Sequence, residues 1–206
     1  MTPGKDSPPA SAGIWLPDEA ATLALARSLT GLLQAGDVVF LIGDLGTGKT
    51  TFARGLINAL PPVGDTGVGD TGVGDTGVGD TGADGAGSGD GAGDEEVPSP
   101  TFTLVQIYER RPAPVWHVDL YRLERPEEVE ELGLEEAAGE AITLIEWPER
   151  LGRRIPADRL EVQLSYGEDA DARSVVLVGY GSWRKRLSAI GSAARPDALE
   201  TAPADR

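Results

Sequence analysis

Eight consecutive residues, from Gly43 to Thr50, carry the clearest chemical signal in the chain. They read GDLGTGKT and match the spacing G-x-x-x-x-G-K-T of a phosphate-binding P-loop. The glycines allow the backbone to curl so that several N–H groups point at one anion. In a loop of this kind, Lys49 reaches the outer phosphates as a solvent-facing cation, and the Thr50 hydroxyl ligates Mg²⁺. The stretch therefore predicts a nucleoside triphosphate site that uses Mg²⁺.

The residues on either side of this loop predict the elements that a P-loop needs. The apolar run at 38–42, VVFLI, predicts a strand that leads into the loop. Residues 51–60 have helical spacing, with apolar side chains at Phe52, Leu56, Ile57 and Leu60. The N-terminus of that helix adds partial positive charge beside an anion. This context disfavours the alternative, a glycine-rich turn with a chance Lys-Thr pair.

A P-loop site also needs an acidic residue at the end of a buried strand, to hold Mg²⁺ or its waters. Asp119 ends the apolar run 115–118 and Glu146 ends the run 142–145, so both have the shape of a Walker B element. For each, the alternative is a carboxylate that caps the next helix. Spacing does not decide between them. His117, the single histidine, shares a strand face with Asp119 and fits a packed structural role as well as a functional one.

The identity of the base is indicated by an absence in the sequence. The guanine-reading motif N-K-x-D is missing, because the single asparagine, Asn58, is followed by alanine. ATP is therefore favoured over GTP.

Hydrophobic periodicity predicts an α/β fold over the rest of the chain. We expect a P-loop NTPase-like, mostly parallel sheet that is flanked by helices and has antiparallel strands added. Predicted strands lie at 14–16, 103–108, 115–120, 141–145, 160–166 and 175–180. One predicted helix begins at Pro17-Asp18-Glu19, and another begins at Pro126 and ends at Gly133. A further turn is predicted at 134–138 and a short basic helix at 182–190.

A five-residue repeat, V-G-D-T-G, divides the predicted domain. Residues 63–93 hold thirteen of the chain's 28 glycines and offer little to bury, so we expect 63–96 to be a disordered insertion. A calcium-binding β-helix is disfavoured because its nine-residue glycine and aspartate pattern is absent. The predicted organisation is a single domain made of 14–62 and 97–190, with disordered tails at 1–13 and 191–206.

Composition excludes several classes of protein. The net charge is −16, of which nine acidic residues lie between 63 and 96, and removing them leaves −7. Tight, sequence-independent binding of nucleic acid by this chain alone is therefore disfavoured. Cysteine is absent, which excludes disulfides and thiolate metal sites. We expect neither a signal peptide nor a membrane span, and therefore a cytoplasmic location.

Four motifs in fixed order resemble the TsaE (YjeE) family of small bacterial P-loop ATPases. They are GDLGTGKT, SPTF at 99–102, HVDLYR at 117–122 and EWPER at 146–150, and the resemblance runs from about 16 to 180 apart from the repeat. It implies an ATP- and Mg²⁺-dependent subunit of the machinery that makes threonylcarbamoyladenosine in tRNA, next to the anticodon. It also implies binding to a modifying heterodimer of the TsaB–TsaD type, with tRNA reached only through the complex and no membrane contact.

The resemblance implies roles for individual residues. Thr50 and Glu146 are similar in position to the Mg²⁺ ligands, and Asp119 to the carboxylate that hydrolysis needs, which acts through water. The segment Glu19 to Thr22 corresponds to the family's approach to adenine. The implied ATP-binding residues are Asp44, Leu45, Gly46, Thr47, Gly48, Lys49, Thr50, Thr51, Ser99, Thr101 and Trp147; the implied catalytic residues are Lys49 and Asp119.

Two other functions share these motifs. A small-molecule kinase would have the same P-loop and acid, but we find no arginine-rich lid in the sequence. A nucleotide-dependent adaptor would bind ATP and a partner and hardly hydrolyse. No arginine holds an obvious catalytic position, although Arg122 and Arg150 lie close in sequence to the two acids.

Overall fold

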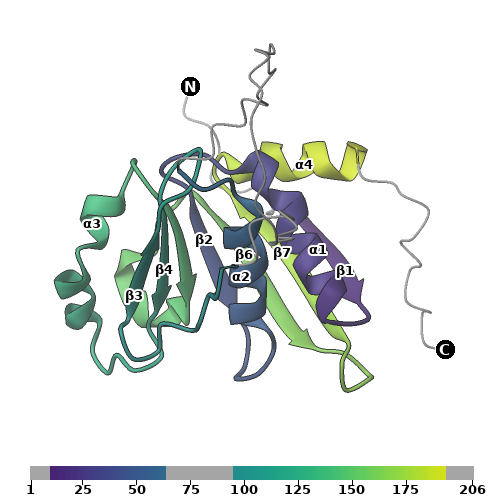
Figure 1. Ribbon diagram of the computed structural model, residues 1–206, viewed down its shortest axis with the longest axis horizontal. Coiled ribbons are helices and arrows are strands. Elements are labelled where there is room, and N and C mark those ends of the chain that lie inside the picture. The colour runs from purple at the N-terminus through teal and green to yellow at the C-terminus, as the bar shows by residue number, and fades with distance from the viewer. Residues whose placement is uncertain (1–9, 64–94, 194–206) are drawn as a thin grey trace, which may run out of the picture.

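The computed structural model describes residues 10–63 and 95–193, which form one mixed sheet with helices on both faces (Figure 1). The strand order across the sheet is β1-β7-β6-β2-β5-β4-β3. The strands are β1 (Ala10–Leu16), β2 (Val38–Ile42), β3 (Val105–Tyr108), β4 (Val115–Asp119), β5 (Ile142–Glu146), β6 (Arg159–Tyr166) and β7 (Arg173–Tyr180).

The centre of the sheet is parallel, as the sequence predicts. Strands β6, β2, β5 and β4 run in one direction, while β3, β7 and β1 add antiparallel pairs at the two edges. Each β5 residue is buried, which explains its unbroken apolar run, because a central parallel strand is covered on both faces. The predicted α/β fold class is confirmed.

Helices cover the two faces unequally. Helices α1 (Glu19–Leu29) and α2 (Lys49–Ala59) lie side by side on one face, and α4 (Trp183–Ala193) packs on β7 and β1 (Figure 1). Their core side chains include Phe52, Leu56 and Trp183. The 3₁₀ segments η2 (Pro126–Leu132) and η3 (Pro148–Arg154) cover the other face; η1 (Thr30–Leu32) and the short α3 (Leu134–Ala137) complete the elements.

Two polar contacts fix helices α1 and α4. Asp18 caps α1 by accepting a hydrogen bond from the amide of Ala21 at 2.7 Å. Arg186, in the predicted basic helix, donates to both carboxylate oxygens of Asp37 at 2.6 and 2.7 Å, just before β2 begins. This bidentate pair is mostly buried, so Arg186 serves the fold rather than a basic surface.

Several predicted boundaries differ from the structure. β1 begins at Ala10, so residues 10–13, which we assigned to the tail, belong to the strand. β3 begins at Val105 instead of residue 103, because Leu104 has a left-handed φ of 65° that no strand continues through. Residues 126–132 form a 3₁₀ segment where an α-helix was expected, and η3 was not predicted.

Most of the predicted disordered segments lie outside the described residues. Residues 1–9, 64–94 and 194–206 are in this group, so their disorder stays a prediction. Residues 191–193, which we assigned to the C-terminal tail, instead end α4, and Val63 and Glu95, which we assigned to the insertion, are hydrogen-bonded to the domain. Within 10–63 and 95–193, no helix is long and apolar enough to cross a membrane.

The domain organisation can be tested by shortening the insertion. Replacing residues 64–94 with a short Gly-Ser linker should leave the melting temperature and the ATP affinity nearly unchanged, because each halving of a flexible loop is worth only ~0.6 kcal/mol. Thermal unfolding followed by circular dichroism, with a nucleotide titration of the same samples, measures both. A large fall in melting temperature would show that the repeat is structured and contributes to the domain.

Candidate functional site

Three neighbouring parallel strands end at the same edge of the sheet. β2 runs into the P-loop, β5 ends at Glu146, and β4 ends at Asp119, which pairs in register with Glu146. Ligands in open α/β sheets bind at the carboxyl ends of the strands. The sheet therefore brings the P-loop and both candidate acids to one place.

The P-loop has the backbone that its glycines permit. Gly43, Gly46 and Gly48 have φ values of 151°, 81° and 99°, which L side chains rarely adopt. A Cβ on Gly43 would collide with the Leu164 carbonyl, and one on Gly46 would lie 2.7 Å from the Tyr166 hydroxyl. The loop is thus shaped for glycine both by its dihedral angles and by the β6 residues against it.

Lys49 is buried, which corrects the prediction that it faces solvent. The residue is 5% exposed, and Nζ donates to the carbonyls of Gly43 at 2.6 Å and Asp44 at 2.9 Å. The ammonium also lies 4.0 Å from the centre of the Trp147 ring. Burial lowers the pKa of Lys49, and the nearby carboxylates of Glu146 and Asp119 oppose that shift.

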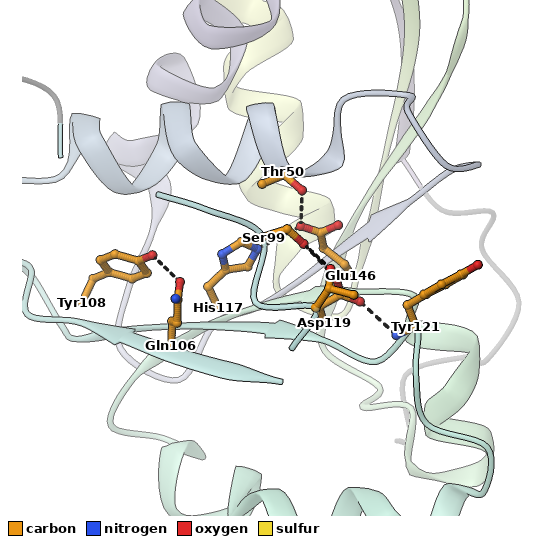
Figure 2. A network of polar contacts seen from close by, with 9 residues as sticks. Thr50, Ser99, Gln106, Tyr108, His117, Asp119, Tyr121 and Glu146 are labelled. Atoms are coloured by element: carbon orange, nitrogen blue, oxygen red, sulfur yellow. Dashed lines mark hydrogen bonds and ion pairs between the residues drawn. The ribbon is translucent and has the colours of Figure 1, made fainter. Parts of the chain in front are cut away.

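Glu146 accepts two hydrogen bonds at a single oxygen, one from the P-loop and one from β4 (Figure 2). Its Oε1 accepts from the Thr50 hydroxyl at 2.9 Å and from Nε2 of His117 at 2.9 Å. His117 is fully buried, and its Nδ1 has no hydrogen-bond partner among the described residues. A carboxylate has no proton to donate, so His117 donates from Nε2 and holds Glu146 toward Thr50.

Asp119 is tied to the segment before β3 (Figure 2). Its Oδ2 accepts from Ser99 Oγ at 3.0 Å and from Thr101 Oγ1 at 2.7 Å, and its Oδ1 accepts from the Tyr121 amide at 2.9 Å. The two hydroxyls lie 2.7 Å apart. Asp119 therefore connects the end of β4 to the SPTF motif, whereas Glu146 connects the end of β5 to the P-loop.

One pocket of about 370 Å³ unites these groups. Most of the predicted ATP-binding residues line it, together with Asp119, Tyr121 and Glu146. The predicted residues that line it are Leu45, Gly46, Gly48, Lys49, Thr50, Thr51, Ser99, Thr101 and Trp147. Asp44 and Thr47 do not: the Asp44 side chain is exposed, and the Thr47 hydroxyl donates back to the Asp44 carbonyl at 2.8 Å.

Trp147 has an unusual backbone at the rim of this pocket. Its φ of 58° is left-handed, a conformation that is costly for a large side chain. Residues in such conformations cluster at functional sites. The ring packs on Tyr121 with centroids 4.9 Å apart, and the Lys49 ammonium lies 4.0 Å from its centre. The indole thus contacts both the P-loop lysine and the residue that follows β4.

A second cavity of about 460 Å³ opens beside the first and shares Gly46, Gly48 and Thr51 with it. Glu19, Ala20 and Thr22 of α1 lie on one side, in the segment linked by resemblance to adenine. The opposite side comes from the β6–β7 hairpin, with Asp171 and Arg173.

Two residues of that hairpin were missed in the sequence. Tyr166 donates its hydroxyl to the Leu45 carbonyl at 2.6 Å, and Arg173 Nη2 lies 3.4 Å from the Gly46 carbonyl while its guanidinium packs on the Tyr166 ring. They lie more than a hundred residues beyond the P-loop, and no local motif marks them. The arginines near the acids are exposed, and Arg122 packs its guanidinium 5.2 Å from the Phe102 ring.

The donor set fits a nucleotide with Mg²⁺. The Thr50 hydroxyl and the Glu146 carboxylate are hard oxygen ligands that face each other in the pocket. Mg²⁺ typically takes one or two protein oxygens, with phosphates and water supplying the rest. The Gly-rich turn and the N-terminus of α2 would supply the N–H groups for the phosphates.

His117 offers a direct test of this arrangement. His117→Ala should weaken Mg²⁺-dependent ATP binding by roughly 10–100-fold, because it removes the group that orients a ligand. His117→Gln should restore most of the affinity, since an amide nitrogen can reach Glu146 as Nε2 does. Nucleotide titrations with Mg²⁺ and with EDTA measure the metal-dependent part. Equal Mg²⁺ dependence in wild type and His117→Ala would contradict this role.

Comparisons with known proteins agree with the geometry. A family model described as "Threonylcarbamoyl adenosine biosynthesis protein TsaE" matches residues 16–66 and 68–175. A protein named tRNA threonylcarbamoyladenosine biosynthesis protein TsaE, from Rickettsia bellii, is 34% identical over 154 residues, covering 75% of this chain and 86% of its own. The Bacillus subtilis protein of that name is 31% identical over 162 residues, covering 78% and 81%.

A solved structure supports the same fold. The crystal structure of Bacillus subtilis YdiB superposes with a TM-score of 0.64 at 23% identity, covering 91% of this chain and 98% of that one. The family model spans both P-loop flanks and all three strands that end at the site. The chain therefore belongs to the TsaE family.

Proposed function

We propose that this protein is a Mg²⁺-dependent ATP-binding and hydrolysing subunit that supports threonylcarbamoyladenosine modification of tRNA next to the anticodon. The curated relatives carry the name of that biosynthesis. The observation that carries the ATPase part is the single pocket that unites Lys49, Thr50 and Glu146 with Asp119 and its two hydroxyl partners.

Each group has a separate task in this proposal. The loop amides and Lys49 hold the phosphates. To do so, Lys49 gives up its hydrogen bonds to the carbonyls of Gly43 and Asp44 and donates to phosphate oxygens instead. Mg²⁺, when bound by Thr50 and Glu146, neutralises charge on the outer phosphates. Asp119 orients the attacking water from the far side, directly or through the hydroxyls of Ser99 and Thr101. The cavity between α1 and the β6–β7 hairpin receives the nucleoside.

The proposed partner is a heterodimer of the TsaB–TsaD type, and tRNA is reached only through that complex, in the cytoplasm. The surface around the pocket suits a partner. Leu45, Phe102 and Tyr121 are 73%, 85% and 45% exposed, and all three lie on segments that line or cross the site. A partner laid over them would exclude water and order the SPTF segment.

The test is ATP hydrolysis by the full chain against heterodimer concentration, with tRNA present and absent. Turnover by the chain alone should be slow and should rise with heterodimer, because fast P-loop hydrolysis commonly needs a cation on the transition state. Fast turnover that does not change with heterodimer concentration would point to a self-sufficient ATPase or a kinase. Tight binding with no turnover in either condition would point to a nucleotide-dependent adaptor.

A further inference from the structure

Arg110 joins three segments of the chain at the base of the insertion. It follows β3 and is only 9% exposed. Its Nε donates to the Ile57 carbonyl near the end of α2 at 3.0 Å, and Nη1 donates to the Glu109 carbonyl at 3.1 Å. Its Nη2 forms an ion pair with the carboxylate of Glu95. One guanidinium thus spans α2, the end of β3 and the first described residue after the insertion.

Both ends of the insertion are held at this place. On the incoming side, Pro62 pairs with Arg110 as an isolated bridge, and the Val63 amide donates to the Glu109 carbonyl at 3.3 Å. On the outgoing side, Asn58 of α2 donates to the Glu95 carbonyl at 3.0 Å. Residues 63 and 95 therefore leave and rejoin the domain at one closed base, whatever lies between them.

The segment that starts at this base leads directly to the site. Four residues after Glu95, Ser99 donates to Asp119. Val97 is buried in the main core, and Pro98 and Pro100 restrict the backbone on both sides of Ser99. The segment then closes with the Leu104 amide on the Pro100 carbonyl at 2.6 Å and the Asp119 amide on the Leu104 carbonyl at 3.0 Å. A displacement of Glu95 should therefore also displace Ser99, because the backbone between them is constrained.

We propose that Arg110 is a positioning residue, which acts through Glu95 to hold Ser99 and Thr101 on the carboxylate of Asp119. This inference rests on the proposed function, since the aligned group is the one assigned to hydrolysis. Arg110 contacts Ile57, Tyr108, Glu109 and Glu95, none of which lines the site pocket. Its effect falls on the rate of the chemical step, because small misplacements of catalytic groups cost rate more than they cost binding.

The variants separate positioning from simple destabilisation. Arg110→Met keeps the apolar stem and removes every donor, while the Ile57 carbonyl keeps the Leu60 amide at 3.3 Å. Arg110→Lys keeps the charge, but one ammonium cannot span three acceptors in different directions. Glu95→Gln keeps an acceptor for Nη2. The matched control is Arg111→Met, at the exposed neighbouring arginine.

The first measurement is kcat and KM for ATP in the full chain with the heterodimer. Arg110→Met should lower kcat by about 10-fold or more and leave KM and the nucleotide Kd within about twofold. Arg110→Lys should fall between, Glu95→Gln should lower kcat less than Arg110→Met because its amide oxygen still accepts from Nη2, and Arg111→Met should match wild type. An unchanged kcat in Arg110→Met, or a parallel loss of kcat, affinity and melting temperature, would overturn the proposal.

The second measurement needs no ATP. Hydrogen exchange at the amides of Leu104 and Asp119 should quicken in nucleotide-free Arg110→Met and not in Arg111→Met, while exchange in α1 stays unchanged. Unchanged exchange at both amides, or faster exchange throughout the domain, would refute positioning. If wild type neither binds nor hydrolyses ATP, the proposed function fails, and the exchange experiment alone decides the claim about Arg110.

Discussion

Lys49→Ala should lower ATP turnover by roughly 10²–10³-fold and remove most of the affinity for the triphosphate, as expected when one charge-stabilising donor is lost from a water-excluded site. Lys49 is the cation at the centre of the pocket. Its ammonium is already sheltered from water and held by loop carbonyls and the Trp147 ring, so little reorganisation separates it from the phosphates.

The measurements are a nucleotide titration and steady-state turnover with the heterodimer, beside thermal unfolding as a check on the fold. Lys185→Ala is the matched control, because it removes the same charge at an exposed position on α4. Unchanged affinity and turnover in Lys49→Ala would show that the P-loop assignment is wrong.

The same lysine predicts a direction for pH dependence. Burial lowers the pKa of Lys49 from its usual 10.5, so the ammonium loses its proton at a lower pH than a free lysine does. Because the charged form binds phosphate, affinity should fall as pH rises through that lowered pKa. A matched titration of Lys49→Ala should lack this decline.

Asp119→Ala and Glu146→Ala should differ in kind. Asp119→Ala should slow hydrolysis by roughly 10²–10⁴-fold with nucleotide affinity little changed, since its partners are the hydroxyls on the far side of the pocket. Glu146→Ala should instead weaken Mg²⁺-dependent binding by at least about tenfold, because it accepts directly from Thr50.

A fluorescent ATP analogue titrated at several Mg²⁺ concentrations, alongside single-turnover hydrolysis, distinguishes the two. Asp119→Asn and Glu146→Gln serve as shape-matched controls that remove charge without removing volume. If the two alanine variants exchange phenotypes, the roles assigned to these acids are reversed.

The network in Figure 2 gives the reason for this separation. Thr50, Glu146 and His117 form one hydrogen-bonded set that includes the P-loop helix, and Asp119, Ser99 and Thr101 form another that includes the SPTF segment. Among the described residues, no side-chain hydrogen bond joins the two sets, although the two acids are register partners on adjacent strands. A substitution that breaks the hydrogen bonds of one set should therefore leave those of the other set intact.

The amino-acid sequence by itself determined the features that depend on neighbours along the chain. A P-loop is a local device, so its glycine spacing and its preceding strand and following helix were enough to predict it, and β2 and α2 confirm them. Apolar runs ending in Asp119 and Glu146 likewise marked two strand ends. The alternation at 160–166 and 175–180 was sufficient to predict two strands, which the structure pairs antiparallel as β6 and β7.

Only the tertiary structure decided which distant groups meet. β5 lies next to β2 while β4 lies one strand further, so Glu146 and not Asp119 reaches Thr50, and no spacing along the chain encodes that order. Arg173, Tyr166 and Arg110 gain their positions from strand pairing across long sequence separations. Lys49 was expected to face solvent because its charge favours water; the folded loop instead offers carbonyls and an aromatic ring that compensate for burial. Local pattern thus specifies elements and their chemistry, whereas the pairing of elements specifies which side chains act together.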